Sequence, residues 1–373
     1  MTGGAGAVKK IRVVESPEKR AWTPGKWYGQ GFQAPGMNWH DFTAKRILGT
    51  VPVETDGSAC FTVPSDTFVF FQLLDENDMM IHSMRSGTVL QAGERTGCVG
   101  CHDHRLTAPP SSGATAPLAL QREPSQMAPW YGPPRIFSYV AEVQPVFNKN
   151  CIRCHDFEKE GSKKVVLAGD KDPFFNASYT QLWRKGYVKA IGAGPAGIQR
   201  AYAWGAHASK IIQHLQKGHN DIKLDKESFD RLVTWIDINA PYYPTYDSAY
   251  PNNMGGRSPL DDAQMRRLGQ LTGVNWDKEV NFGSNTGPWV SFDRPEVSPC
   301  LAKLSKDSPQ YKEALALIQT GKERLEQRPR GDVPDFQPCD KDAQREAFYQ
   351  ERQRIERRNR EAIRLGAKVF DRQ

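Results

Sequence analysis

Two short runs of the sequence place two cysteines and a histidine at a fixed spacing. They are CVGCH at residues 98–102 and CIRCH at residues 151–155. Two thiols in a C-x-x-C arrangement can each add across a vinyl group of haem, and the adjacent imidazole then reaches the iron from the proximal side. In a chain of 373 residues with seven Cys and eight His, two copies of this pattern are not accidental. The predicted attachment and proximal-ligand residues are Cys98, Cys101 and His102 for the first haem c, and Cys151, Cys154 and His155 for the second.

Zinc binding and thiol exchange are the alternatives for these motifs. A zinc ribbon pairs two C-x-x-C elements about 15–20 residues apart. Here 49 residues separate Cys101 from Cys151, and they include a Pro-rich stretch. A thioredoxin-type site places one C-x-x-C at a helix start within a βαβ pattern, which neither motif shows. Two covalent haem groups are therefore favoured, and a zinc-binding structural protein is the weaker alternative.

The iron of a c-type haem has a second axial position, which His or Met often fills. For the second haem the predicted ligand is His219, because it follows a glycine and lies between two amphipathic segments, 209–217 and 225–239. His207 and His214 are the fallback candidates. For the first haem the position stays open between His40, His82, His104, Met84 and no protein ligand.

A third motif, GAGPAG at residues 192–197, matches the dinucleotide-binding fingerprint letter for letter. That fingerprint also needs a buried strand before the glycines and a second strand that ends in an acidic residue about 20 residues on. The preceding RKGYVKAI is short and charged, and position 212 is Ile. We therefore interpret the run as a glycine-rich loop.

The elements that must position the motifs predict an α+β fold. We expect a small antiparallel β-sandwich that carries the first haem, followed by a mainly α-helical, cytochrome c-like domain and a loop-rich, helical C-terminal extension. The predicted parts are a β-rich domain at 1–106, a Pro-rich linker at 107–135, the helical domain at 136–250 and the extension at 251–373.

Within these parts, KKIRVVE predicts an early strand, and two alternating runs joined at Asp56-Gly57 predict a hairpin. A polar turn should follow at Asp75–Asp78. Helices are expected in SYVAEVQPVFNKN before the second motif and in the two amphipathic segments, the later of which begins at an Asp N-cap. Residues 250–300 should be irregular. Further helices should start at Ser308 and span about 341–370.

Bulk properties exclude some classes of function. The formal net charge of +7 is scattered, and four haem propionates would lower it to about +3, so nucleic-acid binding is not indicated. No apolar stretch is long enough to span a membrane. The N-terminal MTGGAGAVKK lacks the apolar core of a signal peptide, so a periplasmic cytochrome would have to be a trimmed or partial chain. For Cys60, Cys300 and Cys339, a Cys300–Cys339 disulfide and three unpaired buried thiols both stay open.

The sequence resembles the hydrazine synthase alpha subunit family of planctomycete-type bacteria. The run from KRILGTVPVETDG to RTGCVGCHDHR resembles its middle domain, and SYVAEVQPVFNKNCIRCH, WIDINAPYYPTY and PRGDVPDFQP resemble its haem-bearing C-terminal part. The resemblance implies a β-propeller ahead of these parts, a bis-His second haem for electron transfer, and a first haem that is the candidate reaction site. In hydrazine synthase itself a Tyr shortly after the first motif takes the iron and the motif His turns to a zinc ion. Leu106 stands at that position here, and the next Tyr is Tyr131, so His102 is expected in the ordinary proximal role.

The predicted function is that of a dihaem c-type cytochrome module, which exchanges electrons with a redox partner protein outside the cytoplasm. The alternative is a hydrazine synthase-like redox enzyme, whose first haem acts on a small nitrogen compound. The short cytochromes that the second half also resembles place a Met-Pro-Pro loop where this chain has Gly218-His219, and they take their iron ligand from that Met. The iron ligands expected here are His102, His155 and His219.

Overall fold

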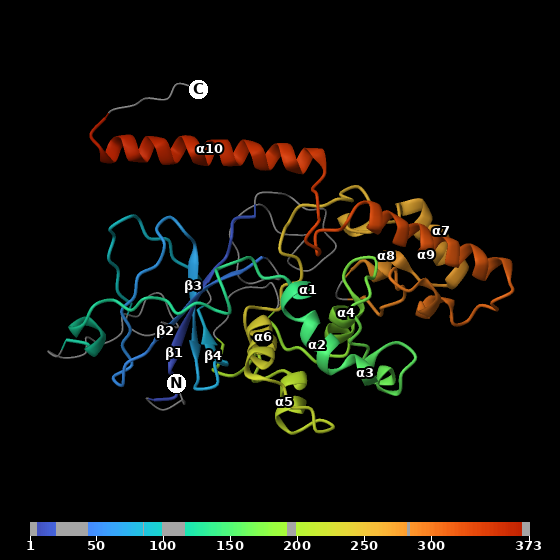
Figure 1. Cartoon of the computed structure of the whole chain (residues 1–373), viewed down its shortest axis with the longest axis horizontal. Coiled ribbons are helices and arrows are strands. Elements are labelled where there is room, and N and C mark those ends of the chain that lie inside the picture. The colour runs from blue at the N-terminus through green and yellow to red at the C-terminus, as the bar shows by residue number, and fades with distance from the viewer. Residues whose placement is uncertain are drawn as a thin grey trace.

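The structure is a computed structural model, and it describes residues 6–19, 44–84, 86–98, 116–191, 199–281 and 284–367. In this part of the chain a small β-sheet lies at one end and most of the helices lie at the other, and the long last helix runs above the sheet (Figure 1). The observed class is mixed α+β, as predicted.

The sheet has four antiparallel strands in the order β2-β1-β3-β4. The strands are β1 (Lys10–Glu15), β2 (Arg46–Pro52), β3 (Val69–Leu74) and β4 (Met80–Ser83). Val13 and Val14 of β1 point to opposite faces of the sheet, and both are fully buried. A strand that is apolar on both faces is stable only inside a sheet, and β1 accordingly pairs with β2 on one side and with β3 on the other.

The predicted hairpin at Asp56-Gly57 is wrong. The chain does turn there, since the Gly57 amide donates to the Glu54 carbonyl (2.9 Å), but β1 separates the two flanking strands in the sheet. Alternating residues cannot reveal that an earlier strand inserts between two later ones. The second predicted turn is confirmed, because the Asp75 amide donates to the Met79 carbonyl (2.9 Å) where β3 turns into β4.

The predicted sandwich is corrected to a single sheet within the described residues. One face of the sheet packs into the main core through Val14, Phe70 and Met80, together with buried residues of the helical part. The other face, around Val13, is covered by loop residues such as Phe61 and Met127. Helices and loops thus remove both apolar faces from water, and no second sheet is needed to do so.

The described α-helices are α1 (Tyr139–Glu142), α2 (Gln144–Asn150), α3 (Ile152–His155), α4 (Ala177–Arg184), α5 (Lys210–Gln216), α6 (Lys226–Asp237), α7 (Asp262–Thr272), α8 (Trp276–Glu279), α9 (Pro309–Gln327) and α10 (Asp340–Arg364). The helices expected from the amphipathic segments, before the second motif and after residue 308 are all present. Asp225 caps α6 as predicted, since its carboxylate accepts from the Ser228 amide (2.7 Å).

The prediction of an irregular chain over 250–300 is wrong, because α7 and α8 lie there. Helix α7 begins with a capping box, in which Asp261 and Gln264 each bond the backbone of the other. Met265 and Leu268 are then buried one turn apart. The D-x-x-Q spacing is a sequence signal for this helix, and the surrounding Gly, Asn and Pro residues obscure it.

A buried charge pair joins the sheet to α6. Arg12 of β1 donates to the side chains of Gln72 (3.0 Å) and Thr234 (3.1 Å), and its guanidinium lies 3.7 Å from the Asp237 carboxylate. That carboxylate also accepts from the Met80 amide (2.9 Å). Burial raises the pKa of Asp237 to about 6, while Arg12 opposes the shift. The largest buried cluster extends from the sheet to α9, and the predicted boundaries at 106, 135 and 250 stay predictions.

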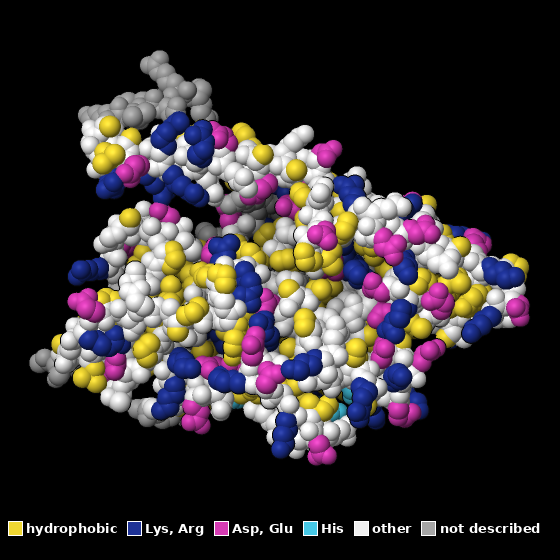
Figure 2. Space-filling view, in the orientation of Figure 1, with side chains coloured by type: hydrophobic (Ala, Val, Ile, Leu, Met, Phe, Trp, Pro, Cys, Tyr) yellow, Lys and Arg dark blue, Asp and Glu magenta, His cyan; other side chains and the backbone are white. Residues whose placement is uncertain are grey.

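Helix α10 carries mostly charged side chains, which line the upper edge of the molecule in Figure 2. Arg345 near its start bonds Asp247 (3.0 Å), and Arg360 pairs with Asp66 in the loop before β3. Phe348 and Ile363 stay exposed. No helix in the described part of the chain is long and apolar enough to cross a membrane.

Candidate functional site

The second C-x-x-C-H motif is built into the helical core. Helix α2 leads directly into it, and the Cys151 amide donates to the carbonyl of the fully buried Phe147 (2.8 Å). The motif itself forms the short helix α3, in which the His155 amide donates to the Cys151 carbonyl (3.0 Å). Residues one helical turn apart share a face, so Cys151, Cys154 and His155 are presented together.

A neighbouring extended segment fixes the ring of His155. The imidazole Nδ1 lies 3.0 Å from the Val165 carbonyl oxygen, and the Leu167 amide donates to the His155 carbonyl (2.7 Å). A carbonyl oxygen can only accept, so Nδ1 is the donor in this bond, and Nε2 is the ring nitrogen left to bind a metal. A backbone carbonyl on the second ring nitrogen is the usual way in which proteins orient a metal-binding histidine.

His219 comes to the same place from 64 residues further along the chain, and its ring centre lies 5.9 Å from that of His155, with 38° between the ring planes. His219 is the first residue of a tight turn. In this turn the Ile222 amide donates to the His219 carbonyl (3.0 Å), and both Asn220 and Asp221 have positive φ. An iron bonded to two imidazoles at about 2 Å on each side places the ring centres about 6 Å apart. The observed separation fits a metal held between these two rings.

The two fallback histidines are engaged elsewhere. His207 Nε2 bonds the Asp75 carboxylate (2.9 Å), and its ring lies against Tyr202. His214 is exposed on α5 with its ring near Tyr187. Of the three candidates considered for the second haem, His219 is the one whose ring lies near that of His155. Its own Nε2 lies 3.4 Å from the side-chain amide nitrogen of Asn220, a contact that would have to open for this nitrogen to bind a metal.

The two thiols of this motif differ in burial. Cys154 is exposed, whereas Cys151 is half-buried, and burial together with the neighbouring Cys154 raises the pKa of the Cys151 thiol to about 11. A thiol with a raised pKa is a poor nucleophile at neutral pH, which weighs against thiol exchange. Cys60, Cys300 and Cys339 are all unpaired, so the Cys300–Cys339 disulfide is not formed. Only Cys300 among these three is fully buried.

The first motif is described only at its first residue. Cys98 is exposed at the end of a stretch, residues 91–98, that is exposed throughout. Earlier in the chain, His82 lies in β4 and Met84 directly follows that strand, and both are partly buried. The other residues that were predicted or discussed for this site, or for the glycine-rich motif, lie outside the described part: Cys101, His102, His104, His40, Leu106 and residues 192–197. Within the described residues no group of three or more His, Cys, Asp or Glu could hold a metal ion.

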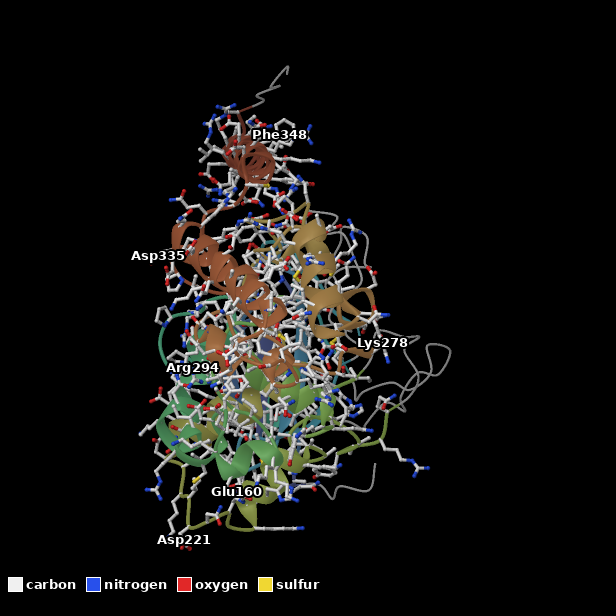
Figure 3. All side chains as sticks on the ribbon, turned by 90° about the vertical axis from the view of Figure 1, so that its right-hand side faces the viewer. Glu160, Asp221, Lys278, Arg294, Asp335 and Phe348 are labelled. Atoms are coloured by element: carbon white, nitrogen blue, oxygen red, sulfur yellow. The ribbon has the colours of Figure 1, made fainter. Side chains whose placement is uncertain are left out.

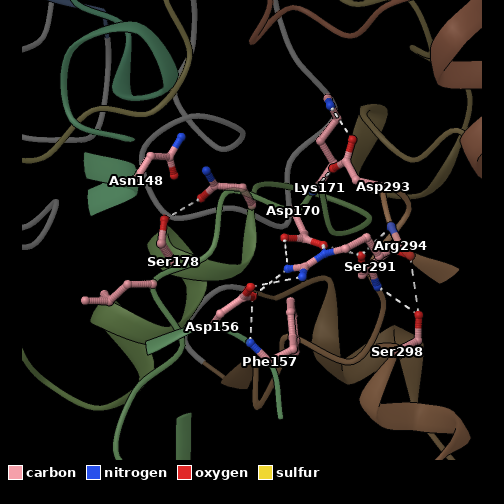
Figure 4. A network of polar contacts seen from close by, with 12 residues as sticks. Asn148, Asp156, Phe157, Asp170, Lys171, Ser178, Ser291, Asp293, Arg294 and Ser298 are labelled. Carbon is pink, nitrogen blue, oxygen red and sulfur yellow. Dashed lines mark hydrogen bonds and ion pairs between the residues drawn. The ribbon is translucent and has the colours of Figure 1, made fainter. Parts of the chain in front are cut away.

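An arginine clamp, which no local sequence pattern indicates, holds the residue after His155 (Figure 4). Arg294 donates twice to the Asp156 carboxylate (3.0 and 2.5 Å) and twice to Asp170 (2.7 Å each). Burial opposes ionisation of Asp156, but the hydrogen bonds from Arg294 outweigh it and hold the pKa of Asp156 below its usual range. The clamp ties the second motif to a segment 138 residues away, inside the stretch predicted to be irregular.

A cavity of about 490 Å³ opens beside α2 and the start of α6. Its wall carries Arg135 and Arg231, both of which pair with Glu142, and Lys149, which pairs with Asp225 (3.0 Å). The charges on the wall are therefore matched, and none of the predicted site residues lines this cavity.

Comparison with known proteins locates the family resemblance. Residues 6–103 match the family described as the hydrazine synthase alpha subunit middle domain. Among solved structures, Kuenenia stuttgartiensis hydrazine synthase is similar with a TM-score of 0.43 and 16% identity, over 64% of this chain and 39% of that chain. This chain thus spans well under half the length of that one. No curated protein matches the sequence.

The matched range includes the whole first motif and ends before the second, so the resemblance of the later segments lies outside it. Residues 6–103 of this chain therefore match the hydrazine synthase alpha subunit middle domain, as the resemblance predicted.

Proposed function

We propose that this chain is a dihaem c-type cytochrome module of a hydrazine synthase alpha-like redox protein, and that it transfers electrons. The observation that carries the proposal is the approach of the His219 ring to the His155 ring at the second motif, at the separation that a shared iron requires. In this proposal residues 136–250 form a cytochrome c-like helical domain.

The residues present fit a covalently attached haem. Cys151 and Cys154 would form the two thioether bonds, and His155 and His219 would hold the iron. When bound, the haem supplies a one-electron couple between ferric and ferrous iron. The chain's own groups hold the ligands in place: the Val165 carbonyl keeps the proton on Nδ1 of His155, and the turn after His219 fixes the direction of the second imidazole.

Two imidazole ligands favour ferric iron more than a His/Met pair does, so the second haem should have a low potential that suits a relay. For the first haem we propose Cys98 and Cys101 as attachment residues and His102 as the proximal ligand. Covalent attachment of haem c takes place outside the cytoplasm, so we place the protein in the periplasm with a redox protein as its partner.

Intact mass after maturation in a host that attaches haem c tests the proposal. Under denaturing conditions the mass should exceed that of the polypeptide by two haems, and the reduced protein should show the absorption bands of low-spin c-type haem. An unmodified polypeptide mass from such a host would contradict the proposal.

A second function is favoured by one observation, because the family match covers the first motif completely. The matched family is named for hydrazine synthase, so the first haem of this chain could bind a small nitrogen compound. In that case the reduced protein should bind CO or NO at one of its two haems. Two haems that both stay low-spin and bind neither gas would remove this function and leave electron transfer.

A further inference from the structure

We infer that the face around His155 and His219 is a docking surface for an acidic patch on a redox partner protein. The inference rests on the proposed function for the role of the site, and on the charges of the described residues for the kind of partner. Two chain segments form the face, residues 149–164 around the second motif and residues 209–226 around His219. The His155 and His219 rings lie near each other where the segments meet, and Lys149 of the first segment pairs with Asp225 of the second (3.0 Å).

Six cations on these segments are exposed and form no ion pair within the described part of the chain: Arg153, Lys159, Lys164, Lys210, Lys217 and Lys223. The other charged side chains are mostly neutralised locally. Lys163 pairs with Glu160 (2.6 Å), and Lys149 with Asp225 (3.0 Å). Glu158 and Asp221 are the exposed acids of the two segments without such a pair, so the unpaired groups leave a net of four positive charges. The two propionates of one haem would not cancel this excess.

A neighbouring lysine, Lys185, extends the positive charge beyond the two segments. The Lys185 ammonium donates to the Lys164 carbonyl, and burial, followed by repulsion from Arg184 and Lys164, lowers the pKa of Lys185. Lys185 lies at the end of α4, so the positive region continues from the loop after the second motif onto a third element.

The views agree that the two segments share one end of the molecule. Helices α3 and α5 lie along the lower side in Figure 1, and Glu160 and Asp221, one from each segment, lie together at the lower end in Figure 3. In Figure 2 histidine side chains appear at this edge among Lys and Arg side chains. Cys154 is exposed here, so a group attached to it would present an edge to the partner.

The chemistry of the face favours a protein over other anionic partners. Its cations come from short loops and helix ends, and none of the large exposed apolar side chains of the described residues lies on either segment. A membrane-binding surface combines basic residues with exposed apolar side chains, which are missing here. Mixed charges with a positive excess around a small site are typical of transient redox contacts, in which electrostatic complementarity raises the association rate.

Binding to poly-L-glutamate tests the surface without relying on haem. The purified chain should bind the polymer at low salt and release it as salt rises. Lys159→Glu, Lys217→Glu and Lys223→Glu together should weaken binding by on the order of 10-fold or more. The matched control reverses Lys303, Lys306 and Lys312, which are exposed on the far part near α9, and should change binding less than about 2-fold. Equal losses in both triple variants would overturn the inference, as would tighter binding of the wild type to phosphatidylglycerol vesicles through the same lysines.

If charge reversal unfolds the chain, Gln is placed at the same three positions instead of Glu. Thermal unfolding checks that each variant is folded. The rate of electron transfer to small charged oxidants then tests whether the surface lies next to the haem site. Each reduced haem gives one electron to ferricyanide, which becomes ferrocyanide, and the rate should fall with salt and in the Lys159, Lys217 and Lys223 variants. With the cationic oxidant tris(phenanthroline)cobalt(III), the rate should rise as salt rises and should also be higher in these variants than in the wild type. If the chain carries no haem, the proposed function is wrong, but poly-L-glutamate binding still tests whether the surface binds an acidic partner. If the rates with both reagents are independent of salt and of these substitutions, the docking role is wrong.

Discussion

The two C-x-x-C-H motifs have the same spacing but differ in how the chain around them is held. Cys98 ends a stretch of eight exposed residues, whereas Cys151 is half-buried and follows a helix whose Phe147 lies in the main core. The second motif is further fixed by the Val165 carbonyl and by the Arg294 clamp. The difference teaches that an attachment motif alone does not define the role of a site. The packing of the surrounding chain determines whether both ligand residues are already held in position.

The largest expected effect comes from removing the attachment cysteines. Replacing Cys151 and Cys154 by Ser should remove one haem from the intact mass and lower the free energy of unfolding by on the order of 3 kcal/mol, because the attached haem can be packed and ligated by His219 only in the folded core. The matched change of Cys98 and Cys101 should also remove one haem but should cost about 1 kcal/mol. Mass spectrometry and denaturant unfolding measure both. Equal losses of stability would break the comparison.

A smaller effect should follow from crowding the second motif. A Cβ at Gly161 would lie 2.5 Å from the Cys154 carbonyl oxygen and 2.9 Å from His155 Nδ1, so Gly161→Ala should cost about 1–3 kcal/mol through displaced backbone. It should also disturb the bond from His155 to Val165 and shift the potential of the second haem. At Gly97, beside the first motif, a Cβ would meet nothing within 4 Å, so Gly97→Ala should stay within about 0.5 kcal/mol. Similar stabilities for the two variants would show that the motifs are held alike.

Removing the clamp should have a modest effect on stability and a clear effect on potential. Arg294→Gln leaves Asp156 and Asp170 without their shared cation, and we expect a loss of about 1 kcal/mol because the arginine side chain is partly exposed to screening water. Losing a positive charge beside the second motif should favour ferric iron and lower the potential of that haem. Lys171→Gln is the matched control, since Lys171 belongs to the same network through Asp293 (2.8 Å) and does not touch Asp156. If both variants give the same potential as the wild type, the clamp has no role at the haem.

A further effect concerns pH at the junction between the sheet and α6. The pKa of Asp237 is about 6 in the folded chain, above the value of about 3.9 expected when unfolded. Between these values the folded chain binds the extra proton, so the Asp237 contribution makes stability fall by about 1 kcal/mol per pH unit as pH rises from 4 to 6. Asp237→Asn should flatten that part of the stability curve relative to the wild type, whatever its effect on absolute stability. An unchanged slope in urea unfolding at pH 4, 5 and 6 would contradict the raised pKa.

Local signals made much of the second site predictable. The C-x-x-C-H motif, the Asp225 cap of α6 and the position of His219 between two amphipathic helices can all be read from neighbouring residues. Long-range pairing cannot be read in this way. Nothing near Arg294 indicates that it bonds Asp156, and nothing between β2 and β3 shows that β1 separates them. These contacts depend on tertiary packing between segments that one-dimensional patterns treat independently.

The central claim is that His155 and His219 are the two axial ligands of one haem iron. Replacing His219 by Met and recording the visible spectrum and midpoint potential of the second haem tests it most directly. We expect the haem to stay attached, a weak long-wavelength band of Met–iron ligation to appear, and the potential to rise by on the order of 0.1 V. His214→Met, five residues earlier on the exposed side of α5, should change neither. If His219→Ala leaves both the spectrum and the potential of the second haem as in the wild type, His219 is not a ligand and the claim is wrong.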